Sequence, residues 1–240
     1  MLDNFSEELS SICATNDPGA ADRVWEVTAA FFARNGFDRL IHIDTGPGHF
    51  ALQTTLPDAW VARYKERGYA AIDPFLSHCC VTFRPISTGI AYADLHQGLS
   101  VAQMTLIDEA SSFGINAGFS STIRLKGDRG IAGWNIGSSL SRQEVDALRL
   151  HSEDRLRLAA QHAHEALDRA RRQTSARLAP REVQCLRFLA QGYRTKDIAR
   201  ALDLSSAAIE LYLRNARRKL GALTREQAIA IATAQGIIAP

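Results

Sequence analysis

Three side chains between residues 60 and 73 have the donor and acceptor types that the polar head of a ligand requires. The indole N–H of Trp60 can only donate a hydrogen bond, the carboxylate of Asp73 can only accept, and the Tyr64 hydroxyl can donate. In an apolar cavity each ligand group needs such a partner, because an unmade buried hydrogen bond costs roughly 1–3 kcal/mol. A structural role is the alternative. Trp60 and Tyr64 have the i, i+4 spacing of core aromatics, and Asp73 precedes Pro74 as a helix N-cap does.

A second group of chemically capable side chains is cationic and lies in the last third of the chain. Residues 175–240 contain 11 Lys/Arg against 5 Asp/Glu, a balance of +6, whereas the preceding 174 residues carry 17 basic and 21 acidic side chains, a balance of −4. This asymmetry, hidden in the overall charge of +2, is expected when one end of a protein contacts nucleic-acid phosphates. The alternative is an ordinary solvated charged surface.

The sequence contains no motif typical of an enzyme. It lacks a G-x-S-x-G elbow and an H-E-x-x-H run, so we predict a protein without catalytic activity, metal or organic cofactor. The polar start carries three acidic residues in its first eight, which argues against a secretion signal, and no apolar run approaches the ~18 residues that span a bilayer. The cysteine spacing fits neither a disulfide framework nor a zinc site, so we predict a cytoplasmic protein with reduced thiols and no membrane contact. The cysteines are Cys13, Cys79, Cys80 and Cys185.

The length of 240 residues favours two domains. In residues 1–172 we expect an α/β sandwich in which helices surround a few antiparallel strands; the family resemblance described below implies an α-β-α order of the layers. Capping residues, glycines and apolar periodicity predict helices over about 17–36, 57–68 and 100–114 and another that starts at Asp73-Pro74, and alternation predicts strands over 39–43, 119–125 and 131–136. The capping box Ser141-Arg-Gln-Glu144 starts a long helix through about Arg172.

Residues 173–177 are predicted to be a linker, because the stretch around them is polar and lacks periodicity. Residues 178–240 then form an all-α domain with helices over about 180–191, 195–202, 206–221 and 224–235. Gln191-Gly192 and Asp203 interrupt the helical pattern, and a helix, a tight turn and a longer helix make a helix-turn-helix. The fold class is therefore α+β, with a C-terminal helical DNA-binding domain.

The 206–221 helix has two distinct faces. The core stripe recurs at i, i+4, i+7 and i+11 and consists of Ile209, Leu213, Ala216 and Leu220. Arginines on another face can neutralise phosphates, and residues near the N-terminal end would approach base edges in the major groove. A charged outer face on a bundle helix is the alternative.

The residues of this domain resemble the LuxR-type helix-turn-helix domain in unbroken register. The resemblance rests on Leu178-Ala-Pro-Arg-Glu182, Leu189-Ala-Gln-Gly192, Lys196-Asp-Ile-Ala199, Leu202-Asp-Leu-Ser205 and Asn215-Ala-Arg-Arg-Lys-Leu220. It implies a tetrahelical domain that binds a two-fold symmetric site on double-stranded DNA and dimerises through its last helix, near Ala228–Ala234. The predicted DNA-binding residues are Thr195, Lys196, Ala207, Ala208, Glu210, Leu211, Arg214, Arg217 and Arg218.

The recognition helix departs from that family. Ala208, Ile209 and Glu210 stand where Thr, Val and Lys are usual, and a usual cap is replaced by Arg194, although Thr195 could cap one residue later. A carboxylate in the groove repels phosphate and accepts only from a donor such as cytosine N4. The operator sequence of relatives therefore does not carry over. Replacing Glu210 by Lys is expected to change site preference and steepen the salt dependence of binding.

The first domain resembles the autoinducer-binding domain of quorum-sensing LuxR-type regulators. The resemblance rests on Leu56-Pro-Asp-Ala-Trp60, Tyr64, Tyr69 and Ile72-Asp73-Pro74 and on their spacing. It implies a sandwich that encloses an N-acyl-homoserine lactone, whose head Trp60 and Asp73 hold and whose tail the tyrosines and apolar residues line. In that pose Asp73 accepts the amide N–H, Trp60 donates to the ring carbonyl and Tyr64 donates to the acyl carbonyl.

This domain also departs from its family. Thr88 replaces a common tryptophan and Leu56 a common tyrosine, so we expect a reshaped head pocket and a branched, aromatic or otherwise unusual ligand. Strand alternation leaves open whether Trp134 or Asn135 faces the pocket. The predicted ligand-binding residues are Trp60, Tyr64, Asp73, Tyr69, Leu56, Phe75, Thr88, Asn135 and Trp134.

These observations predict a dimeric transcription regulator that responds to an autoinducer. Two alternatives stay open: a ligand-independent DNA-binding regulator whose first domain is a protein-interaction or structural module, and an enzyme acting on lactones. A phosphoacceptor receiver would need an acidic pair after its first strand, whereas Asp44 has no acidic neighbour.

Overall fold

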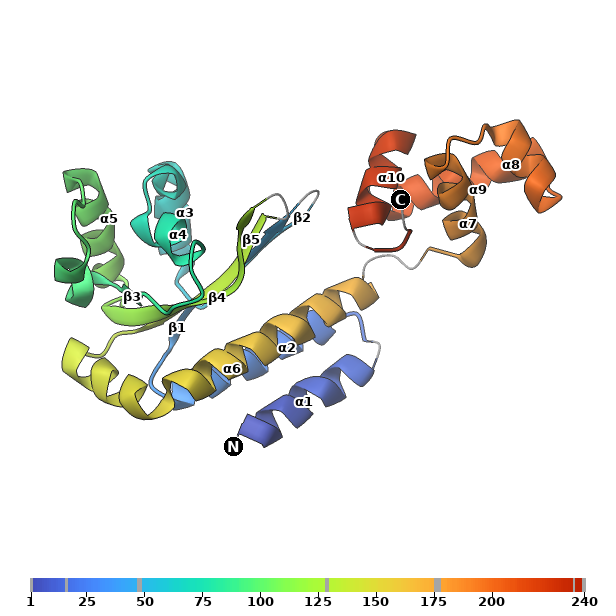
Figure 1. Cartoon of the computed structure of the whole chain (residues 1–240). Coiled ribbons are helices and arrows are strands. Elements are labelled where there is room, and N and C mark those ends of the chain that lie inside the picture. Colours follow the sequence, from blue (N-terminus) through green and yellow to red (C-terminus); the bar gives the residue numbers. More distant parts are fainter. Residues whose placement is uncertain are drawn as a thin grey trace. The chain divides into compact units, whose positions relative to one another are not determined.

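The computed structural model describes residues 2–15, 17–46, 49–127, 130–174, 178–234 and 236–238. The chain forms two compact units, the first made of almost all residues up to 168 and the second mainly of those from 169 onward (Figure 1). Among the described residues, no helix has the length and apolar character needed to cross a membrane.

The first unit is built on a five-stranded antiparallel sheet with strand order β2-β1-β5-β4-β3. The three predicted strands are present, but the sequence did not reveal β2 and β3. β2 is an edge strand whose Phe50 is 72% exposed, so its apolar residues do not mark a buried face. β3 is only two residues long. The strands are β1 (Arg39–Gly46), β2 (His49–Thr54), β3 (Ser87–Thr88), β4 (Ala117–Gly127) and β5 (Gly130–Ser138).

Helices cover both faces of this sheet, as predicted (Figure 1). One face carries α2 (Ala20–Arg34) and α6 (Arg142–Thr174), with α1 (Leu2–Ala14) packed on them; the other carries α3 (Asp58–Glu66), α4 (Pro74–Cys79) and α5 (Val101–Ser112). Short 3-10 helices η1 (Tyr69–Ala71) and η2 (Ile90–Leu95) complete that second layer.

The N-terminal helices differ from the sequence prediction in two places. The polar start gave no sign of α1, which is nevertheless held by the buried Phe5 and Leu9, with the Phe5 ring 4.2 Å from that of Phe31 in α2. The predicted Asp17-Pro18 start is also wrong by two residues, because α2 begins at Ala20 behind Gly19.

The α6 helix begins as predicted, where Glu144 accepts from the backbone N–H and hydroxyl of Ser141. It continues through Thr174, so the first two residues of the predicted linker are helical, and residues 175–177 lie outside the described part. No glycine or proline interrupts the helix there. α6 changes direction in its first half (Figure 1), near the point where the Ser152 hydroxyl donates to the Leu148 carbonyl at 2.6 Å, a bond that often bends helices.

The second unit consists of the four predicted helices, α7 (Pro180–Ala190), α8 (Thr195–Leu202), α9 (Ser206–Lys219) and α10 (Arg225–Ala234). Gly192 and Asp203 have positive φ angles of 87° and 53°, which lets the chain reverse after α7 and α8. The predicted stripe of α9 faces the core, because Ile209, Leu213 and Ala216 are buried.

Candidate functional site

Five of the predicted ligand-binding residues lie in one apolar cluster between the sheet and α3, α4 and α5. Trp60 is 3% exposed, and its ring centroid lies 6.0 Å from that of Tyr64, 6.1 Å from that of Tyr69 and 5.2 Å from that of Phe113. The structure therefore brings together side chains that are up to 53 residues apart in the chain. The predicted members are Leu56, Trp60, Tyr64, Tyr69 and Phe75.

Asp73 has both of the roles that the sequence allowed. Its Oδ1 accepts from the backbone N–H groups of Phe75 at 2.8 Å and Leu76 at 3.2 Å, which caps α4. Its Oδ2 accepts from the Tyr64 hydroxyl at 2.8 Å. Burial raises the pKa of Asp73, although the bonds from Tyr64 and the two amides oppose that rise, and burial beside Asp73 raises the pKa of Tyr64.

The other two polar aromatics differ in what they can offer a ligand. The indole N–H of Trp60 has no hydrogen-bond partner among the described residues, so it is available to donate. Burial, and next the nearby Glu109 of α5, raise the pKa of Tyr69. Tyr69 contributes its ring to the cluster.

The sheet itself contributes Thr88 and Asn135. Thr88 is fully buried, and its hydroxyl donates to Oδ1 of Asn135 at 2.8 Å. Asn135 pairs across the ladder with Ile41, which packs against the aromatic cluster. Of Trp134 and Asn135, it is therefore Asn135 whose side chain lies on the same face of the sheet as the cluster.

Trp134 lies on the opposite face of the sheet, so its prediction as a pocket residue is wrong. Its ring centroid lies 4.3 Å from that of His42 in β1, and 6.1 Å and 6.2 Å from those of Trp25 and Phe32 in α2. Adjacent residues of a strand point to opposite faces, so Trp134 and Asn135 cannot both face the ligand side.

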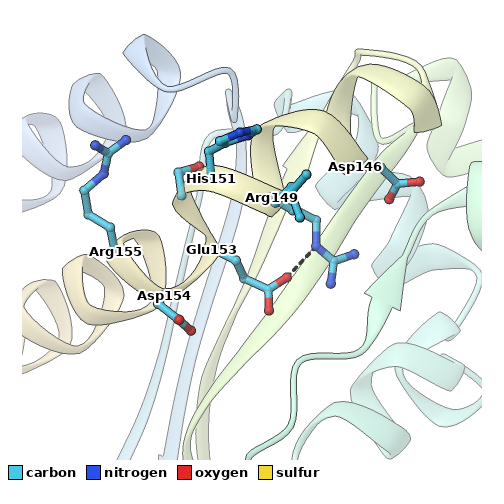
Figure 2. Close-up of a pocket in the computed structure, with 8 residues that line it drawn as sticks. Asp146, Arg149, His151, Glu153, Asp154 and Arg155 are labelled. Atoms are coloured by element: carbon cyan, nitrogen blue, oxygen red, sulfur yellow. Dashed lines mark hydrogen bonds and ion pairs between the residues drawn. The ribbon is translucent and has the colours of Figure 1, made fainter.

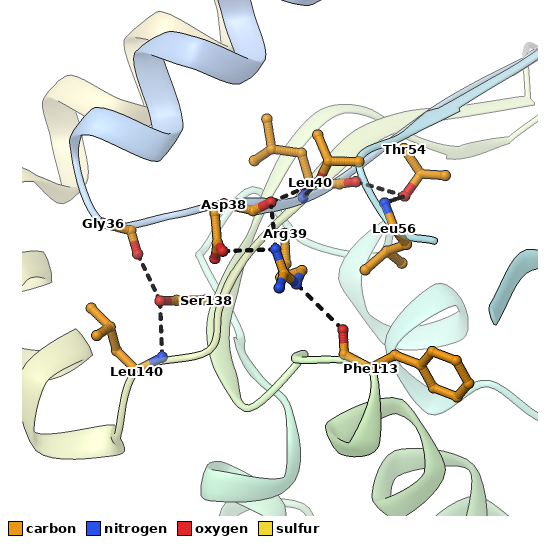
Figure 3. Close-up of polar contacts among 10 residues, drawn as sticks. Gly36, Asp38, Arg39, Leu40, Thr54, Leu56, Phe113, Ser138 and Leu140 are labelled. Carbon is orange, nitrogen blue, oxygen red and sulfur yellow. Dashed lines mark hydrogen bonds and ion pairs between the residues drawn. The ribbon is translucent and has the colours of Figure 1, made fainter. Parts of the chain in front are cut away.

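Hydrogen bonds between side chains and backbone link two members of the cluster, Leu56 and Phe113, to β1 (Figure 3). The Thr54 hydroxyl donates to the Leu40 carbonyl at 2.8 Å and accepts from the Leu56 N–H at 3.1 Å. Arg39 Nε donates to the Phe113 carbonyl at 3.3 Å, and its guanidinium occupies the space beside Gly114 where a Cβ would lie 2.7 Å from Nε. These contacts hold Leu56 and Phe113 of the cluster against β1.

Several residues of the cluster were not predicted. α5 contributes Leu106, Ile107 and Ala110, whose i, i+1, i+4 spacing marks a buried helix face. That spacing predicts a buried face on α5, but periodicity alone does not indicate which helices lie beside the ligand-binding residues. The remaining unpredicted members are Ile41, Ile72, Ile90, Leu99, Phe113 and Ile115.

A separate open hollow is lined by α6 alone, and its chemistry is different (Figure 2). Arg149 Nε lies 2.6 Å from a Glu153 carboxylate oxygen, and Arg149 also donates to the Ser87 hydroxyl at 2.8 Å. Charged side chains predominate, so the hollow does not resemble a site for an apolar tail. Beside it Leu150 is 81% exposed.

The recognition helix α9 presents most of its predicted DNA-contacting residues to solvent. Ser205 caps the helix by accepting from the Ala208 N–H at 3.1 Å, and Leu211 is 43% exposed. Ala208 and Arg217 are the exceptions, because both are half-buried, and Nη2 of Arg217 donates to the Leu223 carbonyl at 2.7 Å. The exposed members are Ala207, Glu210, Leu211, Arg214 and Arg218.

Glu210 contacts two other helices. Arg225, the first residue of α10, directs Nη2 to both carboxylate oxygens, at 2.8 and 2.6 Å, and the Thr195 hydroxyl donates to Oε1 at 3.0 Å. The bond to Arg225 is the main cause that lowers the pKa of Glu210. The prediction that Thr195 caps α8 is wrong: Arg194 is the N-cap residue and provides no side-chain cap.

Two protein families match the chain, and together they span both units. The model of the autoinducer binding domain matches residues 20–167, and that of the bacterial regulatory proteins of the luxR family matches residues 176–232. The chain belongs to the LuxR family of quorum-sensing transcription regulators.

Relatives of this LuxR-family chain are regulators from several bacteria. It is 30% identical over 190 residues to the quorum sensing-dependent transcriptional regulator VjbR of Brucella ovis, covering 77% of this chain and 72% of VjbR. It is 28% identical over 219 residues to the transcriptional activator BjaR1 of Bradyrhizobium diazoefficiens, covering 88% and 87% of the two chains.

Solved structures share the fold at lower identity. Escherichia coli SdiA is 21% identical with a TM-score of 0.63, covering 92% of each chain. CepR2 from Burkholderia cenocepacia, an N-acylhomoserine lactone dependent factor, is 18% identical with a TM-score of 0.54, covering 70% of this chain and 96% of CepR2. The α-β-α sandwich of the first unit and the helical second unit are thus those of LuxR-type regulators.

Proposed function

We propose that this regulator binds an N-acyl-homoserine lactone, or a closely related acyl amide, between the sheet and α3, α4 and α5. The observation that carries the proposal is the half-buried Tyr64–Asp73 hydrogen bond beside the indole N–H of Trp60, which has no hydrogen-bond partner among the described residues. An acceptor and a donor stand next to an aromatic and aliphatic cluster, which is the pairing that an amide head with an apolar tail requires.

The contacts refine the expected roles. Each carboxylate oxygen can accept two hydrogen bonds, so Oδ2 of Asp73 can receive a ligand N–H while it keeps the Tyr64 hydroxyl. Tyr64 then supports Asp73, and a direct bond from Tyr64 to the acyl carbonyl would require breaking that contact. Trp60 remains the donor for the ring carbonyl, and the rings of Tyr69 and Phe75 line the tail.

The ligand head is expected to be larger or more branched than an unsubstituted one. Thr88 is small and binds Asn135, which leaves the amide hydrogens of Asn135 without a partner among the described residues. These hydrogens can donate to a further carbonyl or hydroxyl of the ligand. Among the structural neighbours, SdiA is known in complex with octanoyl-rac-glycerol, so acyl compounds other than lactones belong in the ligand panel.

The regulator is proposed to act as a homodimer on a two-fold symmetric site of double-stranded DNA, in the cytoplasm. We assign residues 1–172 to ligand binding, 173–177 to the linker and 178–240 to DNA binding. The exposed Leu150 and Leu158 of α6 support a sensor-side dimer contact. In α10, Ala228 and Ala232 are buried in the core of their own domain, so the proposed contact shifts to Gln227, Ala230 and Ala234.

The test is the stability of the full chain against a panel of acyl-homoserine lactones and acyl glycerols. A ligand bound only by the folded chain stabilises it by about 2.7 kcal/mol at a hundredfold excess over Kd, so the thermal midpoint rises. Equal expression yield and an equal midpoint with every compound contradict the proposal.

A ligand-independent regulator is the second candidate, and one observation favours it. Both Asp73 oxygens already have partners within the chain, so the pair does not need a ligand to be satisfied. The two functions differ in one measurement, the affinity for a selected DNA duplex with and without ligand. Equal affinities support the ligand-independent regulator, in which the first domain is a structural or protein-interaction module.

A further inference from the structure

We propose that Glu210 is a positioning residue, which holds the guanidinium of Arg225 beside the first turn of α8 so that Arg225 contacts a DNA phosphate. Arg225 was not among the DNA-contacting residues expected from the sequence. The assignment rests on the DNA-binding part of the proposed function and names a further residue of that surface.

The geometry links the N-terminal ends of three helices. Glu210 lies in the first half of α9, Thr195 is the first residue of α8 and Arg225 is the first residue of α10. Arg225 reaches both, with Nη2 at 2.8 and 2.6 Å from the two Glu210 oxygens and Nη1 3.4 Å from the Thr195 hydroxyl oxygen. The guanidinium is therefore adjacent to Thr195, one of the two predicted DNA-binding residues in the first turn of α8.

The contacts leave part of the guanidinium available for DNA. Glu210 accepts only from Nη2 and Thr195 accepts from Nη1, so the Nε–H and the second N–H of Nη1 remain, and each can donate to a phosphate oxygen. Arg225 is 37% and Glu210 51% exposed, so DNA can reach the pair. The carboxylate is also neutralised locally, which removes the repulsion that a free acidic group in the groove would exert.

This role predicts an effect opposite to that of simple charge repulsion. Removing a negative charge near DNA strengthens binding if the charge acts only on the phosphates. Removing Glu210 weakens binding if its carboxylate is what holds Arg225 in place. The Glu210→Gln variant preserves the size of the side chain and so separates the two.

Asp197 provides the matched control. It is an exposed acidic residue in the first turn of α8, two positions after Thr195, and forms no ion pair with any residue that the structure describes. Asp197→Asn removes the same charge from the same region and leaves the Glu210–Arg225 pair intact.

The experiment measures the affinity of the full chain for a 30-bp duplex selected from a randomised pool by the wild-type protein, over a range of salt concentrations. We expect Glu210→Gln to weaken binding about threefold to tenfold and to lower the salt slope by about 1, the loss of one phosphate contact. Arg225→Met should lower the slope by the same amount, and the double variant should be no weaker than Arg225→Met. Asp197→Asn should bind as tightly as the wild type or more tightly.

Two further readouts keep the outcomes distinct. The pair is largely exposed, so the thermal midpoint of Glu210→Gln should match that of the wild type, and a weakened variant with an unchanged midpoint supports positioning. If Glu210→Gln binds as tightly as Asp197→Asn with an unchanged salt slope, the assignment is overturned although the wild type binds DNA. If the wild type selects no duplex at all, the proposed function itself fails, and the assignment with it.

Discussion

Two carboxylates of this regulator, Asp73 in the sensor domain and Glu210 in the DNA-binding domain, have similar partners and opposite surroundings. Each accepts a hydroxyl hydrogen bond, Asp73 from Tyr64 at 2.8 Å and Glu210 from Thr195 at 3.0 Å. Asp73 is half-buried, its other partners are backbone amides, and burial raises its pKa. Glu210 is exposed, pairs with Arg225, and its pKa is lowered.

The surroundings of these two residues determine which partner each carboxylate can take. A buried carboxylate without a cation retains unmet acceptor capacity, so a ligand N–H is the partner that it can still take. An exposed carboxylate beside an arginine is locally neutral and instead orients the cation. We therefore propose that the same functional group takes part in small-molecule recognition at one end of the chain and in phosphate recognition at the other.

The largest effect is expected from Asp73→Ala, which removes the carboxylate acceptor of the proposed ligand site. A hydrogen bond to a charged group contributes about 1.5–3 kcal/mol, so ligand affinity should fall roughly tenfold to a hundredfold in calorimetric titration with the compound that best stabilises the wild type. The exposed Asp58→Ala variant is the control and should bind as the wild type does. Unchanged affinity in Asp73→Ala would remove Asp73 from the ligand site.

A smaller loss is expected from Tyr64→Phe, because this hydroxyl supports Asp73 without contacting the ligand. About 1 kcal/mol, or roughly fivefold in affinity, is the expected cost. Tyr92→Phe is the matched control, since the Tyr92 hydroxyl is also buried and donates to Asp146 at 2.6 Å, away from the aromatic cluster. Equal ligand affinities of the two variants would show that the Tyr64–Asp73 bond has no special part in recognition.

Thr88→Val tests the contact between β3 and β5. The substitution leaves Oδ1 of Asn135 without its donor, so the free energy of unfolding measured by urea should fall by about 1 kcal/mol. Thr28→Val provides the comparison. Thr28 is equally buried, but its hydroxyl donates only to the Val24 carbonyl of its own helix, so a smaller loss is expected. If Thr28→Val costs as much, the Thr88–Asn135 bond contributes nothing beyond burial.

The smallest effect concerns pH. Because the native pKa of Asp73 is raised above the unfolded value of 3.8, the native state binds more protons than the unfolded state above pH 3.8. The contribution of Asp73 to stability therefore falls as pH rises from 3.8 through the raised native pKa. In urea unfolding of the ligand-free protein at a series of pH values, the free energy of unfolding of Asp73→Asn should not show this part of the decline. Parallel pH profiles of the two proteins would contradict the raised pKa.

The helices of the second unit could be predicted to within two residues, because strong periodicity and the turn residues Gly192 and Asp203 mark their ends. No comparable signal marks α1, in which three buried residues stand among polar ones, or the edge strand β2. The orientation of Trp134 could not be known without the register of β5 against β1.

Site residues that lie close together in one segment could be predicted from their spacing. Site residues that meet only through the packing of different helices could not. Trp60, Tyr64 and Asp73 lie within 14 residues and meet as expected. The Arg225–Glu210 pair joins residues 15 apart on different helices, and charge alone does not indicate whether an acidic residue in a recognition helix is free or paired.

The central claim is that the cluster around Trp60 and Asp73 binds an acyl ligand. Mass spectrometry of the small molecules extracted from the full-length protein, purified from its native host, tests this most directly. We predict one acyl compound with an amide or lactone head, at close to one molecule per chain. Folded protein that binds its DNA duplex and releases no such compound would contradict the claim.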